Sequence, residues 1–190
     1  MFWVASLGCQ SSHAQSEASA EREGGFETVR IALAPSFISR ASGLEEWQTG
    51  LGARASASTP YYGGRLELEI SWAPWTTNES SLPDFQALSL LAGWSISTSS
   101  EYRIGLGGGF LVGNVFMLID IDESEDGRFE SEIIVAPFVR ILGKIKDNTH
   151  AFVEFRGVRF YTRPRLEYAD ISMGITLDLE TPAWLRRFLR

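Results

Sequence analysis

The stretch RLELEISW at residues 65–72 alternates strictly between two kinds of side chain. Its even-numbered positions carry leucine, isoleucine and tryptophan, and its odd-numbered positions carry arginine, glutamate and serine. Because successive side chains of a β-strand point to opposite faces, this stretch predicts a strand with one apolar and one polar face. The stretch DISMGITLDL at residues 170–179 repeats the pattern near the other end of the chain.

Segments of this kind recur along the whole chain. We expect strands at residues 27–38, 47–58, 65–75, 85–98, 102–118, 132–145, 151–161 and 169–179. Short connections at 60–64, 99–101 and 146–150 alternate with longer ones at 39–46, 76–84, 119–131 and 162–167. Short turns at one end and long loops at the other are typical of a barrel that crosses an outer membrane. The pattern therefore predicts an all-β fold, an eight-stranded antiparallel up-and-down transmembrane β-barrel with a short C-terminal helix.

The composition agrees with this fold class and excludes others. Hydrophobic residues make up 44% of the 190 residues, but no stretch approaches the roughly 20 apolar residues of a membrane-crossing helix. A formal net charge of -7 argues against nucleic acid as a partner. The chain has a single cysteine, so it has no internal disulfide.

The two ends of the chain differ from the strands between them. We expect residues 1–14 to be the remnant of a signal peptide and residues 15–25 to be a disordered periplasmic lead-in. The barrel then occupies residues 26–179. Residues 180–190 form an amphipathic periplasmic tail, in which Thr181 and Pro182 begin a short helix with apolar residues on one face and arginines on the other.

Charged residues of both signs lie on the polar face of the predicted strands. An eight-stranded barrel has an interior just wide enough for side chains, and an unpaired charge there is costly. The pattern therefore predicts an interlocking ion-pair network that fills the lumen; a gated narrow pore is the alternative. The expected members are Arg30, Arg54, Arg65, Glu67, Glu69, Arg140, Lys144, Glu154, Arg156, Asp170 and Asp178.

Aromatic residues gather where strands meet their connections. Two such bands are typical of the girdles that place aromatic rings at the two membrane–water interfaces. The expected girdle residues are Trp47, Tyr61, Tyr62, Trp72, Trp75, Trp94, Tyr102 and Tyr161.

Metal and catalytic sites have weak signals in this sequence. Asp122, Ser124 and Asp126 resemble the first half of a calcium loop, but the twelfth position is Ile133 instead of glutamate, so we expect no metal and no cofactor. The histidines are His13, in the predicted leader, and His150, in a predicted turn. Because no serine–histidine–acid constellation is visible, we do not expect an enzyme.

The last predicted strand carries a further motif. Ser172, Gly174, Leu177 and Leu179 resemble the assembly signal in the last strand of small outer-membrane barrels, although Leu179 replaces an aromatic residue. Over residues 26–179 the chain resembles the eight-stranded barrels that include the OmpA membrane domain, OmpX and OmpW. The resemblance implies a Gram-negative outer membrane, a monomer, and contacts with lipids, lipopolysaccharide and the barrel-assembly machinery. It also implies a non-enzymatic role in envelope integrity, surface interaction or narrow passage of small solutes.

Two alternatives remain at this point. The first is a lipid-modifying barrel enzyme of the same membrane. The second is a soluble lipocalin-like barrel, in which apolar residues line a ligand cavity and charged residues face water. Periodicity alone cannot say which face of each strand points inward.

Overall fold

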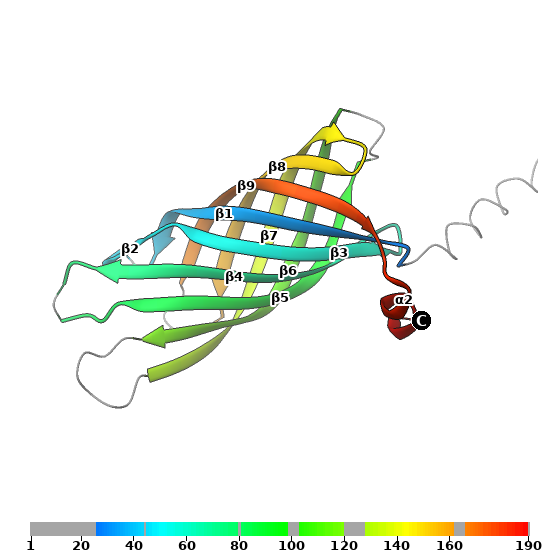
Figure 1. Ribbon diagram of the computed structural model, residues 1–190. Helices are drawn as coiled ribbons and strands as arrows, with labels where there is room; N and C mark the ends of the chain where they lie inside the picture. Colours follow the sequence, from blue (N-terminus) through cyan, green and yellow to red (C-terminus); the bar gives the residue numbers. More distant parts are fainter. Residues whose placement is uncertain are drawn as a thin grey trace, which may run out of the picture.

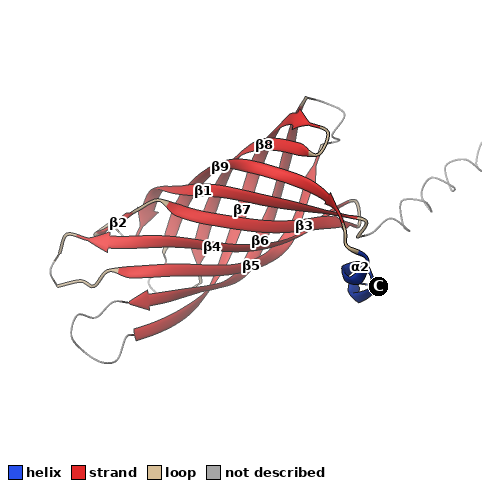
Figure 2. Cartoon of the chain, viewed as in Figure 1, coloured by secondary structure: helices blue, strands red, loops and turns tan. Residues whose placement is uncertain are grey.

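The computed structural model describes residues 26–43, 45–79, 81–98, 103–119, 128–161 and 166–189. Nearly all of these residues belong to one antiparallel sheet that curls into a tube (Figure 1; Figure 2). The strands are β1 (Thr28–Ser42), β2 (Trp47–Thr49), β3 (Gly52–Tyr61), β4 (Gly64–Thr77), β5 (Phe85–Ser97), β6 (Ile104–Ile119), β7 (Arg128–Lys146), β8 (Thr149–Phe160) and β9 (Glu167–Glu180).

The sheet closes on itself. From β3 onward each strand pairs with its neighbour in sequence, and β1 pairs with both β3 and β9. The closing ladder runs from Thr28 opposite Glu180 to Ser42 opposite Glu167. Closure leaves no long unpaired edge, as a membrane interior requires of a sheet. The predicted closed, up-and-down antiparallel barrel is confirmed.

The predicted strand at 47–58 is interrupted in the structure. Both β2 and β3 pair with β4, so the nine strand segments form an eight-stranded wall. Between the pairs Thr49–Trp75 and Ala53–Trp72, three residues, 50–52, lie opposite only two, 73–74. One extra residue on one strand is a β-bulge. The Gly50 amide donates to the Pro74 carbonyl across this bulge at 3.1 Å.

The two ends of the barrel differ, and we name them by their connections. The turn end holds the tight connections at residues 62–63 and 147–148, together with the first residue of β1 and the last residue of β9. In the first of these turns Tyr62 and Gly63 both have positive φ, as a two-residue hairpin requires. The loop end holds the longer connections, and β7, with 19 residues, is much longer than the roughly 9–11 residues that cross a membrane.

A short helix follows the last strand at the turn end. It is α2 (Ala183–Leu189), and Arg186 donates its amide to the Pro182 carbonyl in the first turn. Within the described ranges, the chain contains no helix of the length and apolar character needed to cross a membrane.

Candidate functional site

The outward face of the wall is apolar over all strands of the barrel. Leu33 is 63% exposed, Leu68 57% and Ile175 52%, and most other outward positions are also aliphatic or aromatic. The ion pair of Arg159 and Glu167 lies on this face at the loop end. Charged residues of the same strands point into the bore, where Glu67 and Glu154 are at most 1% exposed. This arrangement is the reverse of a soluble ligand-binding barrel, and so large an apolar surface is suited to hydrocarbon and unsuited to water.

Glu154 lies at the centre of the bore and contacts three arginines. It is fully buried in β8. Its carboxylate accepts from Arg54 Nη1 at 2.5 Å, from Arg140 Nε at 2.7 Å and from Arg156 Nη2 at 2.7 Å. Since these arginines come from β3, β7 and β8, one carboxylate ties together strands on different sides of the tube.

Two glutamates of β4 extend this cluster across the bore. Glu69 accepts from both terminal nitrogens of Arg156, at 2.5 and 2.7 Å. Glu67 accepts from both terminal nitrogens of Arg140, at 3.3 and 3.2 Å, and from the Ser95 hydroxyl at 2.5 Å. Each carboxylate therefore meets a guanidinium in the two-point geometry that strengthens such pairs.

Arg54 completes the cluster from the other side. It pairs with Asp170 and donates to the Ser172 hydroxyl at 2.9 Å. We call the seven charged residues the ion-pair layer: Arg54, Glu67, Glu69, Arg140, Glu154, Arg156 and Asp170. They comprise three cations and four anions, all buried. Such a cluster is tolerable inside a barrel because each charge has a hydrogen-bonded partner of opposite sign.

The other four predicted lumen residues lie apart from this layer. Arg30 pairs with Asp178 at 2.7 and 2.8 Å near the turn end. Arg65 binds the hydroxyl and carbonyl of Ser58, at 3.0 and 2.9 Å. Lys144 pairs with the exposed Asp147 in the neighbouring turn. The structure therefore brings together seven of the eleven predicted residues. The other four, Arg30, Arg65, Lys144 and Asp178, lie nearer the turn end of the bore.

Toward the loop end, the bore is filled by apolar side chains that the sequence analysis did not predict. A stacked pair, Trp75 and Phe85, has ring centroids 5.5 Å apart, and Tyr168 meets Trp75 edge-on at 5.8 Å. The interior cluster beside them consists of Leu91, Leu111, Val115, Ile134, Ala136, Phe138, Val158 and Phe160. We call these residues together the apolar plug. The sequence signal was present, because pairs such as Leu90-Leu91 and Ile133-Ile134 place apolar residues on both faces of one strand.

One predicted girdle residue is wrong: Trp75 is only 2% exposed and lies inside the bore. Trp75 is three residues after the outward-facing Trp72, so strict alternation along β4 puts it on the opposite face. Trp47 and Trp94 are half-buried, and their indole nitrogens donate to the carbonyls of Pro83 and Tyr61. The exposed members are Tyr61, Tyr62, Trp72 and Tyr161, and Tyr102 lies outside the described residues.

The predicted assembly signal lies at the seam between β9 and β1. Leu177 and Leu179 face outward, whereas Ser172 is fully buried. Gly174 lies so close to β1 that an added Cβ would come within 2.1 Å of the Leu33 carbonyl oxygen. Glycine at this position therefore lets the last strand approach the first.

Metal ligation has no visible basis in the part of the chain that the structure describes. No group of three or more histidine, cysteine, aspartate or glutamate side chains there could hold an ion. Asp122, Ser124 and Asp126 lie outside the described residues.

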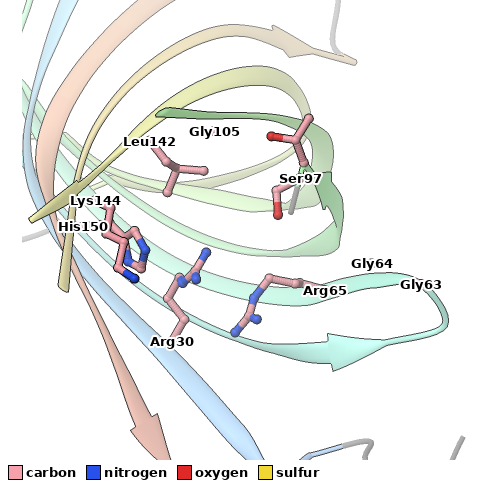
Figure 3. A pocket seen from close by; sticks show the side chains of 10 residues that line it. Arg30, Gly63, Gly64, Arg65, Ser97, Gly105, Leu142, Lys144 and His150 are labelled. Carbon is pink, nitrogen blue, oxygen red and sulfur yellow. The ribbon is translucent and has the colours of Figure 1, made fainter. Parts of the chain in front are cut away.

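A cavity of about 280 Å³ opens at the turn end, and we call it the vestibule (Figure 3). Its polar and charged lining includes Arg30, Arg65, Lys144 and His150. His150 belongs to β8 instead of the predicted turn; it is only 6% exposed and faces this cavity. The next space inward, beside Glu67, measures about 10 Å³, which is near the roughly 10–15 Å³ that one water needs.

Comparisons with known proteins agree on the fold alone. No protein-family model and no curated protein matches the chain. Neisserial surface protein A has a TM-score of 0.58 at 15% identity, over 79% of this chain and 95% of that one. A major outer membrane protein from Thermus thermophilus has a TM-score of 0.59 at 10% identity, over 80% and 99%. Ail of Yersinia pestis, crystallised with the heparin analogue sucrose octasulfate, has a TM-score of 0.54 at 14% identity, over 82% and 99%. The chain has the fold of the small eight-stranded outer-membrane β-barrels.

Proposed function

We propose that this chain is a non-enzymatic barrel of a bacterial outer membrane whose bore is closed and whose loops act at the cell surface. The observation that carries the proposal is the double closure of the bore by the ion-pair layer and the apolar plug. The space beside Arg54, Arg140 and Glu154 has no room for a water molecule. Passage of solutes would require separating buried ion pairs, each of which is costly to break.

The proposed orientation places the loop end outside the cell and the turn end in the periplasm. Long loops lie outside and short turns inside in barrels of this class. Trp184 is 71% exposed, and Arg186 and Arg187 are exposed beside it on α2. An apolar ring near basic side chains is suited to the headgroup region of the inner leaflet.

The proposed partners follow from this orientation. The apolar wall contacts outer-membrane lipids and the base of lipopolysaccharide as a monomer. During biogenesis Ser172, Gly174, Leu177 and Leu179 engage the barrel-assembly machinery, and Gly174 supports this role because it allows β9 to close against β1.

The negative charge of the connection between β6 and β7 indicates which partners could bind at the cell surface. Ail was crystallised with a polyanion. In this chain residues 119–132 carry Asp120, Asp122, Glu123, Glu125, Asp126, Glu130 and Glu132. Like charges repel, so we propose that the loop meets a basic partner, or meets lipopolysaccharide phosphates only through bridging divalent cations, and does not bind an anion directly.

Planar-bilayer recording tests the closed bore. The refolded full chain is inserted into a bilayer, and its folded state is checked by the change in gel migration that boiling produces in barrels. We expect no discrete current steps from the folded protein. Regular steps that disappear with unfolded protein would refute the closed bore.

A lipid assay tests the non-enzymatic part of the proposal. Among the described residues no hydrogen bond joins His150 to a serine hydroxyl, the contact by which a histidine base activates a serine nucleophile. We expect no deacylation or acyl transfer from labelled phospholipid by the folded protein. Turnover by the native chain that His150→Ala removes would establish the enzyme alternative.

A further inference from the structure

The vestibule concentrates positive charge in a partly enclosed space. Arg30, Arg65 and Lys144 line it, and no carboxylate is part of its described lining (Figure 3). Arg30 is neutralised by Asp178, with which it makes two hydrogen bonds. Lys144 contacts Asp147, whose side chain is fully exposed to solvent and screens the charge poorly inside the cavity.

Arg65 differs from the three arginines of the ion-pair layer. Each of those three has at least two carboxylate partners. Arg65 donates to the hydroxyl and carbonyl of Ser58, and no described carboxylate lies within ion-pair distance of it. Its guanidinium therefore has no carboxylate in direct contact and retains donors that can bind an anion.

His150 supplies an independent sign that the cavity is built to hold something. The residue is only 6% exposed, yet its Nδ1 has no hydrogen-bond partner. Asp178 Oδ2 lies 3.7 Å from this nitrogen, beyond hydrogen-bond distance, and accepts from Arg30. Buried polar atoms in folded proteins are nearly always satisfied, so an orphaned nitrogen beside a cavity indicates a missing partner.

We propose that the vestibule binds a phosphate group, with Arg65 as its main ligand. The planar guanidinium suits a tetrahedral oxyanion, Lys144 adds a mobile charge, and the Nδ1 tautomer of His150 can donate a hydrogen bond. A cavity of about 280 Å³ holds a phosphate with several waters. Because the bore is closed just inward of the cavity, the anion binds from the turn end and is not conducted.

The test follows the His150 imidazole by NMR in the full chain. Protein labelled with ¹⁵N-histidine is refolded in an uncharged maltoside detergent and titrated with inorganic phosphate. The chain has two histidines, so His13 serves as an internal reference. Sodium chloride at equal ionic strength controls for screening. We expect a saturable shift of the His150 signals with phosphate, no matching shift with chloride, and no shift at His13.

Two substitutions identify the ligands. Arg65→Gln removes the charge without orphaning a carboxylate, and we expect it to weaken phosphate binding by about ten-fold or more. The matched control is Arg159→Gln, which removes an arginine that pairs with Glu167 on the outer wall at the loop end. It should leave binding unchanged. If Arg65→Gln fails to show the barrel's heat-modifiable migration, Lys144→Gln takes its place and should also weaken binding.

Nanodiscs that contain phosphatidylglycerol distinguish the source of the phosphate. If a lipid headgroup fills the vestibule, the His150 signals start at their bound position and added phosphate does not move them. If the ligand is free phosphate, they start at the unbound position and shift on titration. Absence of a saturable shift in detergent, an equal response to chloride, or unchanged binding by the folded Arg65 or Lys144 variant would overturn the proposal. None of these outcomes bears on the conductance result.

Discussion

Glu154→Gln probes the ion-pair layer at its most connected residue. The substitution keeps the size of the side chain and one carbonyl oxygen but removes the negative charge. It also turns an amide NH₂ toward at least one of the three guanidinium groups that now donate to the carboxylate. The layer would then hold three cations and three anions, with donors facing donors at its centre.

The expected cost follows from the contacts. A hydrogen bond to a charged group contributes about 1.5–3 kcal/mol, and Glu154 accepts three such bonds. Breaking a buried ion pair by removing one partner costs about 3–5 kcal/mol. Because glutamine can still accept one or two of the bonds, we expect the free energy of unfolding to fall by about 3 kcal/mol.

The measurement is equilibrium urea unfolding of the protein refolded into phosphatidylcholine vesicles, followed by the fluorescence of its tryptophans. Glu79→Gln, in an exposed connection at the loop end, is the matched control and should change the free energy of unfolding by no more than about 0.5 kcal/mol. A loss for Glu154→Gln that is indistinguishable from that of the control would refute the reasoning.

A double-mutant cycle sharpens this test. If Glu154 and Arg140 are coupled as their 2.7 Å contact implies, the double variant Glu154→Gln, Arg140→Gln should lose less stability than the sum of the two single variants. Additive losses would mean that the two side chains act independently.

Three further substitutions test the wall and the apolar plug by the same unfolding measurement, and the seam by gel migration. Leu68→Arg places a charge on the outward face and should cost about 2–4 kcal/mol; a negligible cost would mean that this face is not in hydrocarbon. Gly174→Ala should impair barrel closure, seen as loss of heat-modifiable migration, whereas Gly143→Ala, with open space around its Cβ, should fold normally. Trp75→Ala should cost about 3–5 kcal/mol, and more than Trp72→Ala on the outer face; equal costs would argue against an inward Trp75.

The fold was predictable because alternation and connection length are local properties of the chain. The predicted strand at 85–98 ends one residue from the end of β5. The predicted strand at 47–58 covers β2 and β3 but misses the bulge between them, since the bulge depends on how residues 50–52 meet Pro74 on the neighbouring strand. β7 begins four residues before the predicted position because its first residues pair with the end of β6.

The interior was only partly predictable. Alternation correctly placed Glu67 and Glu69 on one face. Because buried negative charges need partners of opposite sign, it also predicted that both would form ion pairs. It could not say that Glu69 meets Arg156 rather than Arg65, because partners across a bore depend on strand stagger and side-chain reach. Trp75 lies near a strand end, as a girdle residue would, but its position along β4 is an odd number of residues from Trp72 and therefore points inward.

The sequence by itself determined eight two-faced strands and their alternately short and long connections, because a period of two residues and the length of a connection are local properties of the chain. Only the tertiary structure decided which side faces inward, since periodicity is the same for either choice. It also decided that the bore divides into a charged layer and an apolar plug, and that His150 faces a basic cavity instead of solvent. The physical reason is that these features depend on residues far apart in sequence, which meet only when the last strand pairs with the first.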